Sequence, residues 1–390
     1  MDNYSFLNAA HTAHFAELYD QYLQQPDSVE PSWRAFFQGF EFGIEESKNE
    51  KLAFKGKEVP DNILKEFKVV KLINAYRTRG HLFTKTNPVR DRRTYLPNLE
   101  IQNFDLSNDD LDSVFNAGEI IGVGATTLTN ILIHLERIYC NSIGIEYMYI
   151  RTPERIQWIQ EKLNHNSNSP DFSNNQKKQI LKKTIEAVAF EKFLHTKYVG
   201  QKRFSLEGGE ALIPALDALI EKAANDGVRE FIVGMSHRGR LNTLTNIFGK
   251  PVEDIFNEFD GKDYEEKAFD GDVKYHLGWT SNRQTDSGLK VFMNIAPNPS
   301  HLEAVGPVVQ GIARAKQEKY HPNNIENVLP IIIHGDAAIA GQGVVYEVVQ
   351  MERLKGYKTG GTIHIVVNNQ VGFTTNYLDG RSSTYCTDVA

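Results

Sequence analysis

Two apolar runs, each followed by a side chain with a hard oxygen atom, constrain the fold of this chain more than any other feature. The first run covers residues 329–335 and leads into Asp336, and the second covers residues 362–368 and leads into Asn369. A glycine turn at 341–343 and a segment with helical periodicity separate the two runs. This order predicts a strand, a helix and a parallel strand, with one oxygen ligand at the carboxyl end of each strand.

Other apolar runs after residue 200 extend this pattern. Strand-like segments at 231–235 and 289–295 come before the two runs described above. Helical patterns separate most of these strands, and they cover residues 210–225, 240–249, 302–319 and 343–355. Alternating strands and helices predict an α/β fold, in which a mostly parallel sheet is covered by helices on both faces.

Each of the four expected strands ends in a group of polar residues, at 236–240, 297–301, 334–336 and 368–370. Ligands of open α/β sheets bind outside the carboxyl ends of the strands, so we expect the four groups to line one crevice. Magnesium takes oxygen ligands and commonly shares one or two protein oxygens with substrate phosphates. Asp336 and Asn369 therefore predict a magnesium-bridged phosphate or diphosphate site, to which Val371 could add a backbone carbonyl. The alternative role for Asp336 is the N-cap of the following helix.

The first polar group also contains two candidates for binding an anion. Arg238 offers several planar donors for a phosphate or a carboxylate. His237 could transfer protons or bind an anionic substrate, and its position next to Arg238 favours this over a structural role. The residues alone favour a structural role for the remaining candidates, which are His276, His301, His334 and His364.

The first half of the chain has a different character. Residues 1–45 are rich in aromatic residues and amphipathic, which predicts a helical arm that packs on the body or docks on a partner. Residues 46–63 are charged and lack periodicity, which predicts a linker, and residues 64–199 predict a mainly helical domain. The α/β domain then occupies residues 200–390. We expect it to be truncated, because the chain stops shortly after a strand end that carries candidate ligands.

Composition excludes several classes of protein. The formal net charge of −7 argues against a general nucleic-acid-binding protein. No run approaches the roughly 18 apolar residues of a membrane span, so we expect no membrane partner. The N-terminus lacks the pattern of a secretory signal. The 2 cysteines, Cys140 and Cys386, are too few for a disulfide framework and indicate a reducing compartment.

Longer strings of residues resemble one family over nearly the whole chain. They are YDQY (19–22), PSWRAFF (31–37), FSLEGG (204–209), HRGRLN (237–242), DVKYH (272–276), NPSHLE (298–303), HGDAA (334–338) and VNNQVGFTT (367–375). Together they resemble the N-terminal portion of the thiamine-diphosphate-dependent first, decarboxylating component of the 2-oxoglutarate dehydrogenase complex. The resemblance implies a thiamine-diphosphate-binding fold that is incomplete at the C-terminus.

The resemblance also implies a role for particular residues. Asp336, Asn369 and the carbonyl of Val371 would hold magnesium, which bridges the cofactor diphosphate. His237 and His276 would act as catalytic residues and, with Ser300, would bind 2-oxoglutarate. The residues that would contact thiamine diphosphate are Arg238, Ser300, Leu302, Asp336, Ala337, Ala338 and Asn369.

The activity implied is the oxidative decarboxylation of 2-oxoglutarate in the citric acid cycle. The succinyl group would pass to a lipoyl group of the partner dihydrolipoamide succinyltransferase, and the arm at 1–45 would dock that partner. The full-length enzyme would be a homodimer in the bacterial cytosol, or in the mitochondrial matrix of a eukaryote. Two alternatives remain open: the related enzyme for 2-oxoadipate, and a non-catalytic fragment that binds the partner.

One departure from the family affects activity. Family members are more than twice as long, and their second half supplies a pyrimidine-binding domain with a glutamate that activates the cofactor. We find no candidate for this glutamate in the sequence. We therefore expect residues 1–390 alone to have little or no dehydrogenase turnover.

Overall fold

The computed structural model describes two compact units, Met1–Pro170 and Asp171–Ala390. The described residues are 21–29, 34, 37, 61–87, 98–260 and 274–389. Most of the expected arm at 1–45 and of the expected linker at 46–63 lies outside them.

The first unit is built mainly from helices. Its longer helices are α3 (Asp61–Arg79), α4 (Leu128–Tyr139) and α5 (Pro153–His165). The shorter elements of this unit are η1 (Pro26–Ser28), η2 (Gly80–Phe83), η3 (Ile101–Phe104), η4 (Asn108–Asp110), β1 (Val114–Phe115), η5 (Asn116–Ile121) and β2 (Thr126–Thr127). Because α3 begins at Asp61, the last residues of the expected linker are helical rather than irregular.

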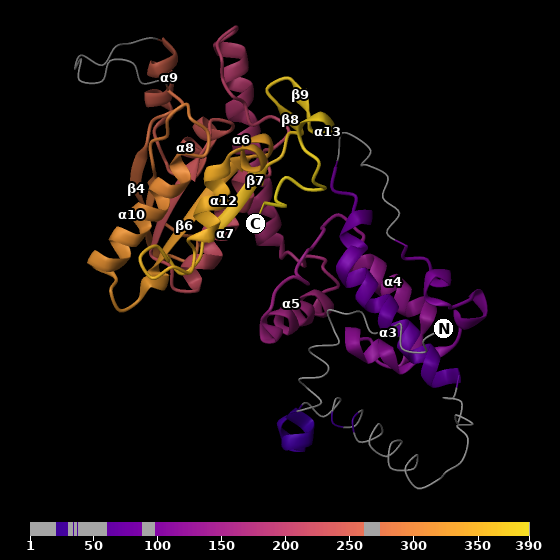
Figure 1. Ribbon diagram of the computed structural model, residues 1–390. Helices are drawn as coiled ribbons and strands as arrows, with labels where there is room; N and C mark the ends of the chain where they lie inside the picture. Colours follow the sequence, from indigo (N-terminus) through magenta and orange to yellow (C-terminus); the bar gives the residue numbers. More distant parts are fainter. Residues whose placement is uncertain are drawn as a thin grey trace, which may run out of the picture. The chain divides into compact units, whose positions relative to one another are not determined.

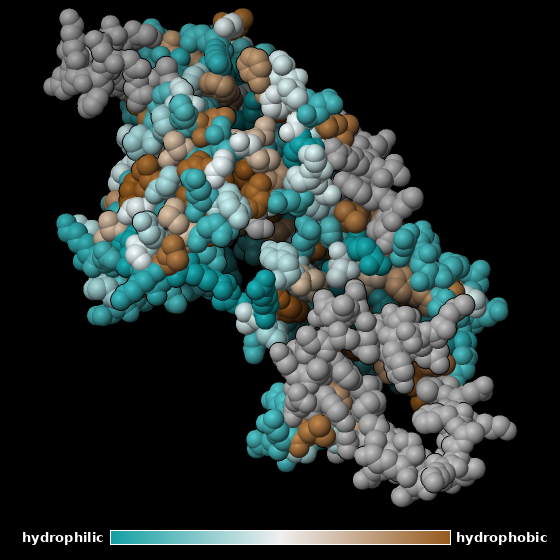
Figure 2. Space-filling model, viewed as in Figure 1, coloured by the Kyte–Doolittle hydropathy of each residue, from teal (hydrophilic) through white to brown (hydrophobic). Residues whose placement is uncertain are grey.

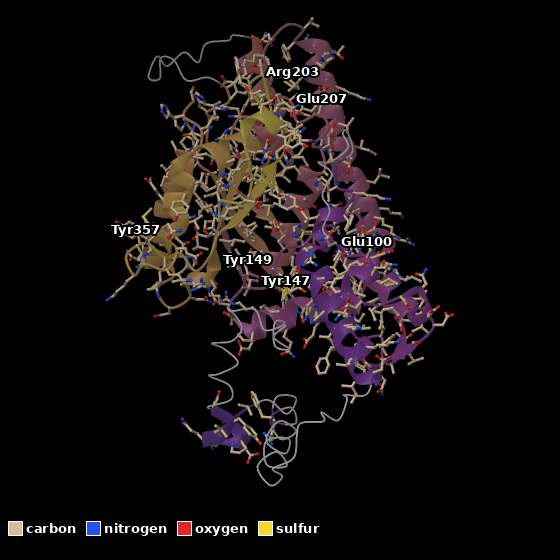
Figure 3. The ribbon with its side chains drawn as sticks, turned by 45° about the vertical axis from the view of Figure 1, so that its right-hand side comes forward. Glu100, Tyr147, Tyr149, Arg203, Glu207 and Tyr357 are labelled. Atoms are coloured by element: carbon tan, nitrogen blue, oxygen red, sulfur yellow. The ribbon has the colours of Figure 1, made fainter. Side chains whose placement is uncertain are left out.

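The core of the first unit lies between α3 and α4. Leu72 of α3 and Ile131 and Leu135 of α4 are fully buried there, at the spacing that places residues on one helical face. Tyr147, labelled in Figure 3, completes this core, and its hydroxyl lies 3.1 Å from that of Tyr139. The two hydroxyls satisfy each other, as buried polar groups generally require.

The second unit contains a five-stranded sheet. The strand order is β4 (Trp279–Gln284), β5 (Lys290–Ile295), β3 (Glu230–Met235), β6 (Val328–Gly335) and β7 (Ile363–Val367). β5, β3, β6 and β7 are parallel, and only the edge strand β4 is antiparallel to its neighbour. The expected α/β fold with a mostly parallel sheet is confirmed.

Helices cover both faces of this sheet (Figure 1). Phe231 and Val233 of β3 point to one face and pack with α6, α7 and α8, whereas Ile232 points to the other and packs with α10. Gly234 brings α10 close, because a Cβ there would lie 2.8 Å from Cγ2 of Val309. The α-helices of the second unit are α6 (Asn174–Lys197), α7 (Leu212–Asn225), α8 (Arg240–Asn246), α9 (Val252–Asp260), α10 (Val305–Tyr320), α11 (Asp336–Gly341), α12 (Gly343–Gln350) and α13 (Tyr377–Gly380).

Some elements differ from the sequence-based expectation. The two units divide between Pro170 and Asp171, so α6, which we expected in the helical domain at 64–199, packs with the α/β unit. The edge strand β4 was not expected, because its residues alternate between half-buried and exposed without an apolar run. Apolar residues also interrupt the polar surface over α10 and α12 (Figure 2), and Val308 of α10 is exposed.

Candidate active site

The candidate site lies at the carboxyl ends of the parallel strands. β3 lies between β5 and β6, so the chain passes to one side of β3 for β5 and to the other side for β6. Ligands of open α/β sheets bind at such a reversal of strand order. The candidates follow the four strands in turn: His237 and Arg238 after β3, Ser300 after β5, Asp336 after β6 and Asn369 after β7.

Three of the candidates form what we call the histidine cluster, which consists of His237, His276 and Ser300. Nε2 of His276 lies 3.1 Å from Nε2 of His237 and 3.3 Å from the hydroxyl oxygen of Ser300. A neutral imidazole carries one N–H donor and one acceptor, so one ring donates to the other at this contact. The residues alone favoured a structural role for His276, whereas the resemblance implied a role in substrate binding; the structure brings His276 into contact with His237.

The environment of His237 disfavours its charged form. Its pKa is lowered from the ordinary histidine value, first by burial and then by the charges of His276, Arg240 and Lys202. The ring of Phe204 packs 5.2 Å from the His237 ring, centre to centre, and contributes apolar surroundings. His237 is therefore poised as a neutral hydrogen-bonding group, and an incoming anion would favour its protonation.

Arg240 ties together the strand ends beneath the histidine cluster, and the sequence did not single it out. Its side chain is fully buried. The guanidinium donates to three backbone carbonyls, at 2.9 Å to Met235, 2.6 Å to Leu277 and 2.7 Å to Ala296. These carbonyls belong to the end of β3, to the residue after His276 and to the residue that follows β5. One side chain thus fixes the three backbone segments that carry the cluster.

The remaining candidates form a second group, the oxygen cluster, which consists of Asp336, Asn369 and the carbonyl of Val371. One terminal atom of the Asn369 amide lies 3.0 Å from Oδ1 of Asp336 and 3.1 Å from the carbonyl oxygen of Val371. The other terminal atom lies 3.3 Å from Nε of Arg238. Arg238 therefore links the end of β3 to the oxygen cluster at the ends of β6 and β7.

The two orientations of the Asn369 amide have different consequences. With Nδ2 toward Asp336 and Val371, the amide donates to both oxygens and Oδ1 accepts from Arg238. With Oδ1 in that place, three oxygens converge, and the N–H of Val371 lies 3.4 Å from Oδ1. Converging oxygens repel one another unless a cation lies among them, and a carboxylate, an amide and a carbonyl are ligands that suit magnesium. The donor set thus fits a hard divalent cation.

Asp336 is the only acidic member of the oxygen cluster, and it is 2% exposed. Burial raises the pKa of its carboxyl, and the nearby charge of Arg381 acts in the opposite direction. Nη1 of Arg381 lies 3.5 Å from Oδ2 of Asp336. A buried carboxylate is stable only with a charged or hydrogen-bonding partner, and Arg381 is one that the sequence did not identify.

A short hairpin carries the Val371 carbonyl to the start of α11. Its strands are β8 (Val371–Gly372) and β9 (Thr375–Asn376). A Cβ at Gly372 would lie 2.8 Å from the Cβ of Ala337, so only glycine allows this approach without displacement. Of the other expected cofactor contacts, Ala338 is buried in α11, and Leu302 is 40% exposed on the loop before α10.

The loop before α7 holds Arg238 in place. Nη1 of Arg238 donates to the carbonyl of Ser205 at 3.1 Å. Arg203 and Glu207, labelled in Figure 3, flank Ser205, and Nη2 of Arg203 lies 4.0 Å from Oε2 of Glu207. This bond anchors Nη1 of Arg238 on the loop, while Nε of Arg238 lies beside the Asn369 amide at the strand ends.

A line of side chains also runs across the α10 face of the sheet, from the buried Glu303 and His334 to the more exposed His364. Oε2 of Glu303 lies 2.5 Å from Nδ1 of His334, and Nε2 of His334 lies 2.8 Å from Nδ1 of His364. This line joins the loop of Ser300 to β6 and β7. His334 and His364, for which the sequence favoured a structural role, contact each other rather than the histidine cluster.

The comparison with known families decides the relationship. The family model described as "Dehydrogenase E1 component" matches residues 182–390, more than half of the chain. The chain belongs to the dehydrogenase E1 component family. A second family model, described as "2-oxoglutarate dehydrogenase N-terminus", matches residues 4–43. The expected resemblance is confirmed, and membership of this family implies a requirement for thiamine diphosphate.

Curated relatives agree with this assignment. The 2-oxoglutarate dehydrogenase E1 component of Azotobacter vinelandii is 43% identical over 100% of this chain and 44% of its own length. The corresponding protein of Cupriavidus necator is 42% identical over 99% of this chain and 43% of its own length. The multifunctional 2-oxoglutarate metabolism enzyme of Mycolicibacterium vanbaalenii is 48% identical over 85% of this chain and 27% of its own length. The chain thus spans less than half of each relative.

Among the described residues, no helix is both long and apolar enough to cross a membrane. In the same part of the chain, no group of three or more His, Cys, Asp and Glu side chains could hold a metal ion. The oxygen cluster is a different kind of candidate, because two of its three ligands are an amide and a backbone carbonyl.

Proposed function

We propose that the protein containing this chain catalyses the oxidative decarboxylation of 2-oxoglutarate, with thiamine diphosphate and magnesium as cofactors. The names of the three relatives support the substrate. The observation that carries the proposal is the position of the oxygen cluster beside the histidine cluster. Arg238 connects them, since it directly follows His237 and its Nε lies 3.3 Å from the Asn369 amide. A diphosphate and an anionic substrate can therefore be bound at one crevice.

The oxygen cluster is proposed to hold the cation and the diphosphate. Asp336, Asn369 and the carbonyl of Val371 would bind magnesium, in the orientation that turns Oδ1 of Asn369 toward the other two oxygens. The other residues proposed to contact the cofactor are Arg238, Ser300, Leu302, Ala337 and Ala338. Thiamine diphosphate, when bound, supplies a carbanion nucleophile and an electron sink for the loss of carbon dioxide.

The histidine cluster is proposed to bind the distal carboxylate of 2-oxoglutarate. The Nε2 atoms of His237 and His276 lie 3.1 Å apart, and a carboxylate that accepts a hydrogen bond from His237 would favour the protonated form of that ring. Ser300 can donate its hydroxyl to the same carboxylate or to His276. The histidines would act as catalytic residues by holding this proton beside the reacting substrate.

The partner proposed for the succinyl group is a lipoyl group of dihydrolipoamide succinyltransferase. The arm at 1–45, of which residues 4–43 match the family model described as "2-oxoglutarate dehydrogenase N-terminus", is proposed to dock this partner. We infer a homodimer for the full-length protein, in the bacterial cytosol or the mitochondrial matrix. Because the chain spans 44% of one relative, we infer that residues 1–390 alone have little turnover.

Release of carbon dioxide by the full-length protein tests this proposal. With thiamine diphosphate and magnesium, kcat/KM should be higher for 2-oxoglutarate than for 2-oxoadipate. Greater activity on 2-oxoadipate would show that 2-oxoadipate, and not 2-oxoglutarate, is the substrate. Activity on neither acid would refute the proposed reaction.

Deletion of residues 1–45 should abolish capture of the succinyltransferase, and unchanged capture would refute the docking role of the arm.

A further inference from the structure

We propose that Arg381 is a positioning residue for the cation site, an inference that rests on the proposed function of the oxygen cluster. The two carboxylate oxygens of Asp336 face different partners. Oδ1 lies 3.0 Å from the Asn369 amide, whereas Oδ2 lies 3.5 Å from Nη1 of Arg381. A carboxylate turns freely about its last torsion unless both oxygens are engaged. The contact with Arg381, together with the backbone N–H groups of Asp336 and Ala337, thus favours the orientation that turns Oδ1 toward Asn369.

Arg381 is itself held firmly. Its side chain is 10% exposed, and the central carbon of its guanidinium lies 5.3 Å from the centre of the Tyr377 ring. This arrangement is a cation–π contact in a largely desolvated setting. The guanidinium is therefore clamped between an aromatic ring and a buried carboxylate.

Backbone hydrogen bonds also link Arg381 to the segment that carries the other two proposed ligands, Asn369 and the carbonyl of Val371. The backbone N–H of Arg381 donates to the carbonyl of Tyr377 at 3.2 Å. The N–H of Tyr377 donates to the carbonyl of Gln370, also at 3.2 Å, and Gln370 lies between Asn369 and Val371. The chain thus runs from the oxygen cluster through β8, β9 and α13 and returns to Asp336 through the side chain of Arg381.

Arg381 affects cation affinity in two opposite ways, through the repulsion of its charge and through its positioning of Asp336, and the geometry favours the positioning effect. The positive charge of Arg381 repels a cation, so its removal could strengthen binding. Loss of the Arg381 side chain, however, removes the guanidinium that contacts Oδ2 of Asp336 and with it the side-chain link between Asp336 and the segment at Tyr377. Partners that orient metal ligands typically contribute about 10–100-fold to metal affinity. We therefore expect positioning to outweigh repulsion, because Arg381 contacts the oxygen that faces away from the cluster.

The experiment measures the dissociation constant of Mn²⁺, detected by electron paramagnetic resonance, for the full-length protein with thiamine diphosphate. Arg381→Gln should weaken Mn²⁺ binding about 10–100-fold. Arg381→Lys keeps the charge but loses the planar contact with Tyr377, so it should recover part of the affinity. Unchanged or tighter binding by Arg381→Gln would overturn the inference.

Two controls separate this inference from the proposal on which it rests. Arg314→Gln removes an arginine that pairs with Glu318 within α10, at 2.6 Å, and should leave Mn²⁺ binding unchanged. Asp336→Asn should abolish Mn²⁺ binding. If it does not, the oxygen cluster is not the cation site and the proposed function fails. If Asp336→Asn acts as expected and Arg381→Gln binds normally with an unchanged melting temperature, only the role of Arg381 is refuted.

Discussion

His237 and His276 meet through their Nε2 atoms at 3.1 Å, although 39 positions separate them in the chain. One follows the parallel strand β3, and the other precedes the antiparallel edge strand β4. Because the two rings are in direct contact, substitutions at the two positions should not act independently.

A double-mutant cycle tests this coupling. We expect His237→Gln and His276→Gln each to lower kcat/KM for 2-oxoglutarate about tenfold or more, because a hydrogen bond to a charged group contributes about 1.5–3 kcal/mol. The double variant should lose less than the product of the two single losses. Strictly multiplicative losses would show that the rings act separately.

The pH dependence of stability follows from the lowered pKa of His237. As the pH falls through about 6.5, the unfolded chain takes up the histidine proton before the folded chain does, and stability is lost. His237→Gln cannot take up this proton, so its melting temperature should fall less than that of the wild type between about pH 7.5 and about pH 5.5. Parallel curves for the two proteins would contradict the lowered pKa.

Arg240→Met tests the role of the buried guanidinium. The substitution keeps most of the apolar volume but leaves the carbonyls of Met235, Leu277 and Ala296 without this donor. An unsatisfied buried group costs about 1–3 kcal/mol, so we expect the free energy of unfolding to fall by about 3 kcal/mol or more. Denaturation by urea measures this quantity, and a loss under about 1 kcal/mol would mean that other groups satisfy the carbonyls.

Gly372→Ala tests the approach of the hairpin to α11. The added Cβ would meet the Cβ of Ala337 at 2.8 Å and displace the Val371 carbonyl, so affinity for thiamine diphosphate with magnesium should fall severalfold or more. Gly341→Ala is the matched control, because a Cβ there has nothing within 4 Å. Calorimetric titration compares the two variants, and equal affinities would show that the hairpin does not position a ligand.

The parallel strands and the strand-end candidates could be predicted from the sequence, for a physical reason. Buried strands such as 329–335 read as continuous apolar runs, and their polar ends are therefore conspicuous. The edge strand β4 lacked this signal because only one of its faces is partly buried. The position of α6 could not be predicted either, since it depends on tertiary contacts with α7 and α8.

The residues that support the site were harder to predict. Arg240 and Arg381 stand in polar segments where an arginine is usually solvated, and only the folded chain shows them buried against carbonyls and against Asp336. The resemblance assigned His276 to substrate binding, but the residues alone did not. Its partner His237 lies on a segment distant in the chain, and no local sequence pattern indicates that contact.

Binding of thiamine diphosphate with magnesium by Asp336→Ala and Asn369→Ala variants of the full-length protein tests the central claim most directly. Both variants remove an oxygen ligand from the same cluster, so each should weaken magnesium-dependent binding at least about tenfold relative to the wild type. Isothermal titration with and without magnesium measures this difference. Wild-type affinity for the cofactor and for magnesium in both variants would contradict the account.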